Sequence, residues 1–258
     1  MTLYLTSSHT LGWAGDLNPA NGLIDELKAS LSHPIRCVMI SSFPDDVEIT
    51  DRMAWEVREC FEHADLAFNH YEVLDRRTES EAERMLKEAN FIFICGGHVP
   101  TENDFLKDIK LKQHIKNFDG VLLTISAGSM NCADNVYSPP EMDEEMLDPK
   151  YKYHRKGLAL TDINILPHLQ TLQDMVLAGK HIINDIAKAD SMEHPIYLLH
   201  DGSFFIIKDG TTELRGEAYL MNKGKKRKVC SDGERKLLKN GRLYSVSQFD
   251  LRRLKAKS

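Results

Sequence analysis

Short apolar runs alternate with amphipathic stretches through the first two-thirds of the chain. The runs end at polar or glycine-containing segments, as buried strands do. Between two runs, Ile49, Met53, Val57, Cys60 and Phe61 recur at the spacing of one helix face. Strands that alternate with helices predict a parallel sheet with helices on both faces. The predicted strands are residues 3–6, 37–41, 68–74, 91–95 and 121–125.

Two further helices are expected before residue 120. The sequence Thr78-Glu79-Ser80-Glu81 has the spacing of a capping box and predicts the start of the helix that carries Met85 and Leu86. Apolar residues at 105, 106, 109 and 111 indicate a second helix, which we expect to end before Asp119-Gly120.

The pattern changes in the last third, where short apolar runs at 196–199, 203–208 and 214–221 are separated by Asp201-Gly202 and Asp209-Gly210. Two such turns predict antiparallel hairpins that extend the sheet. Because no Pro-, Gly- or Ser-rich linker interrupts the chain, we expect one domain over 1–258, with a core at 1–221 and a basic extension at 222–258. Its basic runs, 223–228 and 252–257, are interpreted as a solvated hairpin turn and a terminus.

The composition of the chain argues against several classes of partner and site. The 258 residues are 42% hydrophobic and 28% charged with a net charge of −6, so nucleic acid is not an expected partner. No secretory signal is visible and no apolar run approaches membrane-spanning length, so no membrane partner is expected. The five cysteines are scattered and show no metal-ligand spacing, which predicts reduced thiols in a cytoplasmic protein without a metal site.

The most informative segment is the apolar run 121–125 followed by Ser126-Ala127-Gly128. A buried strand, a sharp turn carrying a serine and then a helix form a nucleophile elbow. The Ala127 amide would lie at the helix start, where it can stabilise an oxyanion. Thr124 occupies the position of the first glycine in the usual G-x-S-x-G motif. The alternative to a nucleophile elbow is a strand–turn–helix junction in which the serine has no catalytic role.

A nucleophilic serine needs a base and a group that orients the base. His168 is the best candidate base, because Pro167 keeps the preceding residue extended and places the histidine at the end of an apolar segment. Two acids are candidates. Asp201 follows the run 196–199, although Asp before Gly is also common turn chemistry, and Glu141 lies in the loop after the elbow helix, where it could equally be a surface acid.

A second loop at the carboxyl end of the predicted sheet reads Gly96-Gly97-His98. Gly97 can bring a second backbone N–H to the oxyanion, and His98 is a candidate substrate contact that competes with His168 as base. A double glycine after a strand also suits a nucleotide-binding turn. The dinucleotide fingerprint G-x-G-x-x-G is absent, however, so no nucleotide cofactor is expected.

Together these motifs resemble the dipeptidase E and cyanophycinase family of serine peptidases, within the class I glutamine amidotransferase-like superfamily. The resemblance runs from the first strand to about Met221. It rests on Ile94-Cys95-Gly96-Gly97, Ser126-Ala127-Gly128, Leu166-Pro167-His168 and Leu199-His200-Asp201-Gly202-Ser203. It implies a three-layer α/β sandwich with a mainly parallel, flavodoxin-like sheet and C-terminal antiparallel hairpins.

The resemblance also implies roles: Ser126 as nucleophile, His168 as base, Glu141 or Asp201 as acid, and Gly97 with Ala127 as oxyanion donors. We therefore expect a cytoplasmic, cofactor-free serine hydrolase that cleaves a small peptide or amide bond and that can form a homodimer. In the family, the cleaved bond is next to an aspartate. The loop 98–103 differs from the N-T-F type sequence of the peptidases, so the aspartyl preference is not carried over. A non-catalytic small-molecule-binding or regulatory protein with this fold is the alternative. A glutamine amidotransferase would need a cysteine at position 126.

Overall fold

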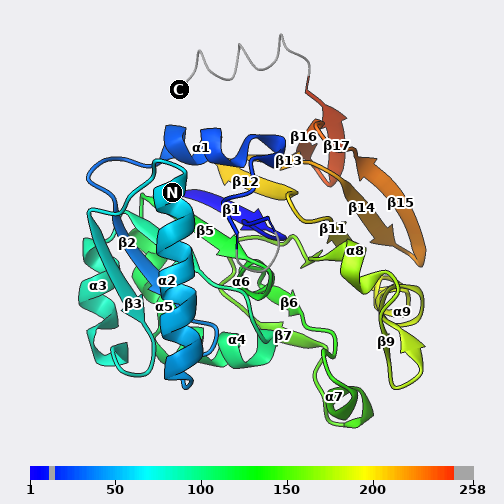
Figure 1. The fold of residues 1–258 in the computed structure, drawn as a ribbon. Coiled ribbons are helices and arrows are strands. Elements are labelled where there is room, and N and C mark those ends of the chain that lie inside the picture. Colours follow the sequence, from blue (N-terminus) through cyan, green and yellow to red (C-terminus); the bar gives the residue numbers. More distant parts are fainter. Residues whose placement is uncertain (12–14, 247–258) are drawn as a thin grey trace.

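A nine-stranded sheet forms the centre of the molecule in the computed structural model, which describes residues 1–11 and 15–246 (Figure 1). Five neighbouring strands are parallel, and four antiparallel strands extend the sheet beyond β1. In order across the sheet, the strands are β17 (Arg242–Ser245), β16 (Arg235–Lys239), β13 (Thr211–Arg215), β12 (Phe204–Lys208), β1 (Thr2–Thr6), β5 (Val121–Ile125), β4 (Phe91–Ile94), β2 (Arg36–Ile40) and β3 (His70–Leu74).

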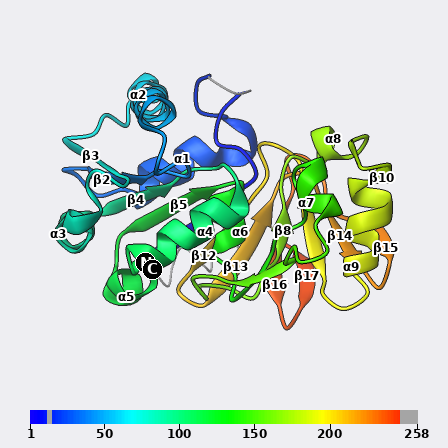
Figure 2. The same ribbon diagram turned by 90° about the horizontal axis from the view of Figure 1, so that it is seen from below.

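The parallel strands are buried on both faces, as their continuous apolar sequences require. In β1, Tyr4 packs into one hydrophobic cluster while Leu3 and Leu5 pack into the other. Helices α1 (Leu23–Ser30) and α2 (Val47–His63) cover the Tyr4 face. The opposite face is covered by other helices, which Figure 2 shows on the far side of the sheet from α2: α3 (Ala82–Glu88), α4 (Val99–Asp108), α5 (Leu111–His114) and α6 (Ala127–Asn131).

A second, four-stranded sheet packs beside α6 on the Leu3 face. Its strands, in spatial order, are β15 (Lys225–Cys230), β14 (Ala218–Asn222), β11 (Ile196–Leu199) and β8 (Ile165–Leu166). Strands β11 and β8 are parallel neighbours. The remaining elements are β6 (Asn135–Tyr137), β7 (His154–Lys156), α7 (Asp143–Leu147), α8 (Leu169–Leu172), β9 (Val176–Leu177), β10 (Lys180–His181), a π-helix (Ile182–Ala187), α9 (Lys188–Asp190) and 3₁₀ turns at Ala20–Gly22, Glu79–Glu81 and Ile115–Asn117.

The structure confirms the mixed α/β class and one of the two predicted hairpins. Lys208 pairs with Thr211 across Asp209-Gly210, whose positive φ angles of 49° and 71° suit a two-residue hairpin turn. The hairpin expected at Asp201-Gly202 is wrong. Strand β11 pairs with β14 and β8 in the second sheet, whereas β12 pairs with β1 and β13 in the main sheet. The turn therefore carries the chain from one sheet to the other.

The helical segment that carries Met85 and Leu86 does begin directly after Thr78, as the 3₁₀ turn Glu79–Glu81 that leads into α3, but the predicted capping bond is absent. The Thr78 hydroxyl caps no helix; it donates to the Val73 carbonyl (2.8 Å) and accepts from the Asp75 amide (3.1 Å), so it closes the turn after β3. A second helix boundary, before Phe105, is wrong. The helix expected around Phe105 begins earlier, at Val99. It ends at Asp108, and Lys110 then has a φ of 52° that continues no helix.

The basic run 223–228 forms the turn and outer strand of the β14–β15 hairpin, with Lys223-Gly224 at its tip. Because β15 lies at the edge of the second sheet, its exposed charges discourage pairing with another chain. The ordered fold continues past Met221 through β15, β16 and β17, and the basic run 252–257 lies outside the described residues.

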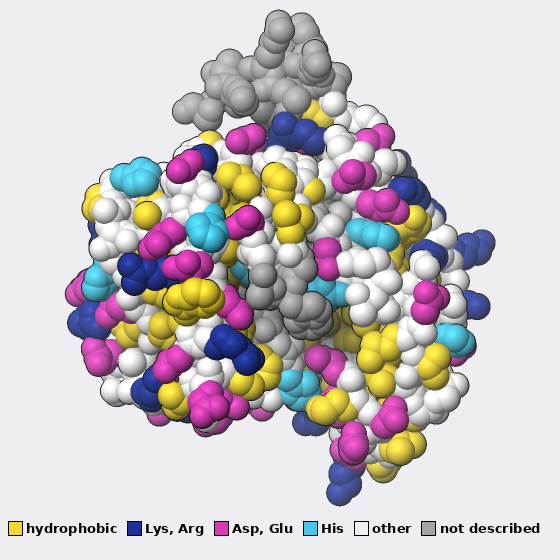
Figure 3. Space-filling view, in the orientation of Figure 1, with side chains coloured by type: hydrophobic (Ala, Val, Ile, Leu, Met, Phe, Trp, Pro, Cys, Tyr) yellow, Lys and Arg dark blue, Asp and Glu magenta, His cyan; other side chains and the backbone are white. Residues whose placement is uncertain are grey.

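Charges of both signs are interspersed on the face shown in Figure 3. Among the residues the structure describes, no helix is long and apolar enough to cross a membrane.

Arg215 provides a test of the packing between α1 and the extended sheet. Its side chain is 4% exposed and pairs with Glu26 (2.7 Å) and Glu213 (2.5 Å). Removing a buried charge from its partners costs about 3–5 kcal/mol, whereas an exposed ion pair contributes about 0–1 kcal/mol. We predict that Arg215→Met lowers the free energy of unfolding in urea by about 3 kcal/mol or more. The exposed control Arg84→Met should lose less than about 1 kcal/mol, and equal losses would contradict this account.

Candidate active site

Ser126 lies on a strained turn at the carboxyl end of β5. Its φ of 49° and ψ of −112° are unusual for a residue with a side chain, as a nucleophile elbow requires. The Ser126 amide donates to the Thr6 carbonyl of the neighbouring strand (3.0 Å), and its carbonyl accepts from the Met130 amide (3.0 Å) in α6. The turn is therefore fixed on both sides of the serine.

Close approach of backbone segments explains the small residues around the elbow. A Cβ on Gly96 would lie 2.9 Å from the Ser126 Cβ, and one on Gly128 would lie 2.7 Å from the Cys95 carbonyl oxygen. Only glycine fits at either position without a shift of the backbone.

Thr124, which replaces the usual first glycine of the elbow, has its own partners. Its buried hydroxyl donates to the Tyr4 carbonyl (2.8 Å) and lies 2.8 Å from the Ser129 hydroxyl. Ser129 in turn accepts from the Thr6 amide (2.9 Å). These bonds fasten the start of α6 to both β1 and β5, so the threonine is compatible with the elbow.

His168 and Asp201 approach Ser126 from the second sheet. Because β8 and β11 are parallel neighbours, the segments that follow them emerge at the same edge. The His168 Nε2 lies 3.0 Å from the Ser126 Oγ, and the His168 Nδ1 lies 2.7 Å from the Asp201 Oδ1. The geometry is that of a nucleophile, a base and an orienting acid.

Two further side chains bind Asp201. The Ser7 hydroxyl donates to its Oδ1 (2.7 Å), and the Gln170 amide donates to its Oδ2. Partial burial alone would raise the pKa of Asp201. The hydrogen bonds from His168, Ser7 and Gln170 outweigh burial and hold that pKa below its ordinary value. The carboxylate is therefore ionised at neutral pH.

Glu141, the other candidate acid, is bonded elsewhere. Its Oε1 accepts from the Val99 amide (3.2 Å), and its own amide donates to the Glu145 carboxylate (2.8 Å). The residue is exposed overall, but its carboxyl end lies among protein atoms. That burial, together with the negative charge of Glu145, raises the pKa of Glu141, against the effect of the Val99 hydrogen bond and the nearby histidines.

His98 is likewise bonded away from the serine. Its Nε2 lies 2.7 Å from Glu145 Oε1 and its Nδ1 lies 2.8 Å from Thr101 Oγ1. The structure thus brings His168, and not His98, into hydrogen-bond contact with Ser126.

Gly97 and Ala127, the expected oxyanion donors, follow adjacent parallel strands. Gly97 lies just beyond β4 and Ala127 just beyond β5, so both backbones reach the same sheet edge. Gly96 packs directly against Ser126, as described above, and its carbonyl accepts from the Ser42 hydroxyl (2.7 Å). The double-glycine loop therefore lies beside the candidate nucleophile.

Sequence reasoning missed Ser7 and Gln170. Ser7 had a signal, because it follows β1 just as Ser126 follows β5, at the edge where ligands bind in parallel sheets. Gln170 had none, since its contact with Asp201 depends on how the segments after β8 and β11 meet.

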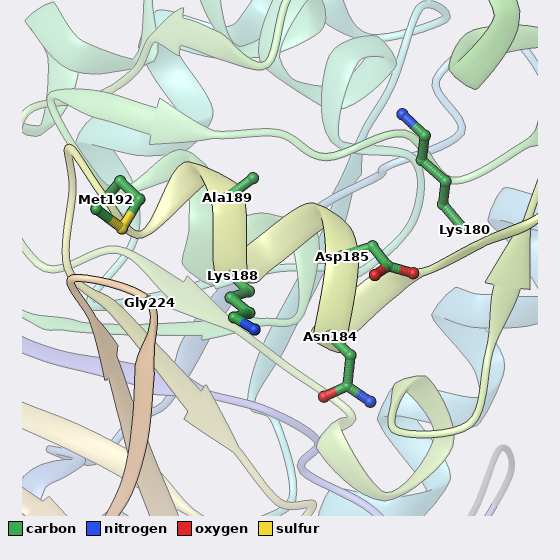
Figure 4. A pocket seen from close by; sticks show the side chains of 7 residues that line it. All are labelled: Lys180, Asn184, Asp185, Lys188, Ala189, Met192 and Gly224. Carbon is green, nitrogen blue, oxygen red and sulfur yellow. The ribbon is translucent and has the colours of Figure 1, made fainter.

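No group of three or more His, Cys, Asp or Glu side chains in the described part of the chain could hold a metal ion. An open pocket between the π-helix and the β14–β15 turn is lined by Lys180, Asn184, Asp185, Lys188, Ala189, Met192 and Gly224 (Figure 4). Ser126, His168 and Asp201 are not among its lining residues.

Comparison with known proteins decides the family. Residues 6–215 match the sequence profile of peptidase family S51. The chain belongs to this family of serine peptidases. No curated protein matches its sequence.

Two solved structures share the fold. A peptidase from an acI-B1 Actinobacterium has a TM-score of 0.63 and 16% identity, covering 95% of this chain and 96% of that one. A protein of Listeria monocytogenes EGD-e, described as a candidate peptidase E, has a TM-score of 0.55 and 19% identity, covering 82% and 96%. The fold shared with these two structures thus extends over most of this chain.

His9, close to Ser7 in the sequence, offers a test of burial near the site. Burial of its ring, which packs edge-on against Phe93, lowers its pKa to about 3 from an ordinary 6.5. Between these values only the unfolded chain binds the proton, so stability falls as the pH falls, by up to about 1.4 kcal/mol per unit. We predict a shallower decline for His9→Leu than for wild type in urea unfolding between pH 6 and pH 4. The exposed control His181→Leu should follow wild type, and a wild-type slope in His9→Leu would contradict the burial of a neutral imidazole.

Proposed function

We propose that this member of family S51 is a serine hydrolase that cleaves a small peptide or amide bond through Ser126, His168 and Asp201. The observation that carries the proposal is the chain of two hydrogen bonds from Ser126 Oγ to His168 Nε2 and from His168 Nδ1 to Asp201 Oδ1. A serine without a catalytic role would need neither the strained backbone of Ser126 nor the hydrogen bond that joins its amide to Thr6 of β1.

In the proposed reaction the Ser126 Oγ attacks the substrate carbonyl carbon while His168 Nε2 takes its proton. Collapse of the tetrahedral intermediate breaks the C–N bond, and His168 returns the proton to the leaving amine. Water then attacks the acyl-enzyme by the same route in reverse, which releases the acid and restores the serine. Asp201 stays ionised throughout and stabilises the imidazolium that forms at each step.

Gly97 and Ala127 are the proposed oxyanion donors. Ala127 follows Ser126 directly, and Gly97 follows Gly96, whose backbone lies against Ser126 at the carboxyl edge of the sheet. Fixed N–H groups at that edge can stabilise the charge that develops on the carbonyl oxygen. The loop that follows Gly97 carries His98, which with Glu145 is the proposed wall of the substrate site. This wall departs from the family pattern, so we do not extend the family preference for aspartyl bonds to this chain.

The proposal predicts that Ser126→Ala abolishes hydrolysis. The wild-type protein, incubated with a library of short peptides that includes aspartyl and isoaspartyl dipeptides, should release new amino groups detectable by mass spectrometry. The alanine variant should reduce the rate by several orders of magnitude, because it removes the atom that forms the acyl-enzyme. Circular dichroism should show the same fold for both proteins. A folded Ser126→Ala variant with wild-type turnover would overturn the assignment.

The roles of the two candidate acids can be separated by matched isosteric changes. We predict that Asp201→Asn slows the reaction of Ser126 with a fluorophosphonate by about 10³- to 10⁴-fold, because the amide favours the wrong histidine tautomer. Glu141→Gln should slow it by less than about tenfold, since Glu141 bonds to Val99 and not to His168. The larger loss in Glu141→Gln would make Glu141 the acid.

A further inference from the structure

The carboxyl end of β1 contacts every member of the triad. The Thr6 carbonyl accepts from the Ser126 amide at 3.0 Å. Ser7, the next residue, donates its hydroxyl proton to Asp201 Oδ1 at 2.7 Å and accepts from the His168 amide at 2.8 Å. Ser7 is fully buried, and its own amide donates to the Ser203 carbonyl at 3.2 Å.

We propose that Ser7 is a positioning residue that fixes the acid and the base, both from the second sheet, against the nucleophile from the main sheet. This inference rests on the proposed function, because it assigns Ser7 a part in activating Ser126.

The need for such a residue follows from the topology. His168 and Asp201 lie on segments that follow β8 and β11, whereas Ser126 follows β5 in a different sheet. Small displacements between a nucleophile and its base are costly, because a misplacement of about 1 Å can reduce the rate about 100-fold. A single Ser7 hydroxyl, bonded to both segments and rigidly joined to β1, limits such displacements.

Gln170 provides an internal comparison. Its side-chain amide donates to Asp201 Oδ2, and its carbonyl oxygen accepts from the Asp201 amide at 3.2 Å. Gln170 lies on α8, in the same segment as His168, so it ties the acid to the base. Ser7 alone of these two side chains joins the pair to the main sheet.

The directions of the hydrogen bonds to Asp201 also affect how strongly its carboxylate stabilises the imidazolium of His168. Asp201 accepts from His168, Ser7 and Gln170. The Ser7 hydroxyl has one proton, and its 2.7 Å contact with the carboxylate is much shorter than its 3.4 Å contact with the Leu199 carbonyl, whereas it accepts from the His168 amide. Loss of the Ser7 donor leaves the carboxylate a stronger acceptor for the imidazolium proton. Glu141 is the other charged group whose electrostatic interaction with His168 the structure shows, and the Ser7 change leaves it in place.

The test is the rate at which a fluorophosphonate labels Ser126 in the full chain, measured against probe concentration and pH. For Ser7→Ala we expect the limiting rate to fall about 10- to 100-fold while the probe affinity changes by less than about twofold. The acidic limb of the pH profile should move to higher pH, because the imidazolium is held more tightly. If Ser7 had only a structural role, Ser7→Ala would not move the acidic limb of the pH profile, and it would not lower the limiting rate while leaving the probe affinity unchanged.

Matched variants complete the experiment. Gln170→Ala, at an exposed position, should move the acidic limb in the same direction with a smaller loss of rate, and Ser7→Cys should be intermediate because the thiol is a weak donor. Ser8→Ala is the control, since that hydroxyl donates to the Thr10 carbonyl (3.2 Å) and should leave the rate unchanged.

Two outcomes are decisive. If Ser126→Ala is unlabelled but folded Ser7→Ala keeps the wild-type rate and pH profile, the inference about Ser7 fails and the proposed function stands. If the label falls elsewhere than Ser126 in the wild-type protein, the proposed function itself fails.

Discussion

The hydrogen bonds among Ser126, His168 and Asp201 join two sheets that share no strand. The geometry of the site therefore depends on how the main sheet and the second sheet are held against each other. The main sheet supplies Ser126, whose φ of 49° is a conformation that costs about 1–3 kcal/mol and persists only where the surrounding contacts enforce it. Here the enforcing contacts are the close approach of Gly96 and Gly128 and the buried hydroxyls of Thr124 and Ser129.

Two carboxyl groups near His168, those of Asp201 and Glu141, have opposite environments, which favours different roles for them. Asp201 receives hydrogen bonds that keep its pKa low, whereas burial and a like charge raise the pKa of Glu141. A group that must stabilise an imidazolium needs to be ionised, so the environment of Asp201 suits the role that we propose for it. Glu141 instead bonds to the first amide of α4, beside the double-glycine loop.

The sequence was sufficient to predict the parallel sheet, the strand–turn–helix at Ser126 and His168 as the candidate base, because each is marked by a local pattern. The choice between Asp201 and Glu141 could not be made from the sequence, since both lie in loops whose positions depend on the pairing of distant strands. The same limit explains the error at Asp201-Gly202. That dipeptide has the chemistry of a hairpin turn, but the strands on either side pair with partners in different sheets. Ser7 and Gln170 were missed because their contacts exist only once both sheets are in place.

The central claim is that Ser126 is a nucleophile activated by His168. The most direct measurement is peptide mass spectrometry of the folded protein after reaction with a fluorophosphonate, with His168→Ala treated in parallel. The account predicts a stoichiometric adduct on the peptide containing Ser126 in the wild-type protein and a loss of that adduct in the variant. An unmodified Ser126 in the folded wild-type protein, or equal labelling in His168→Ala, would contradict it.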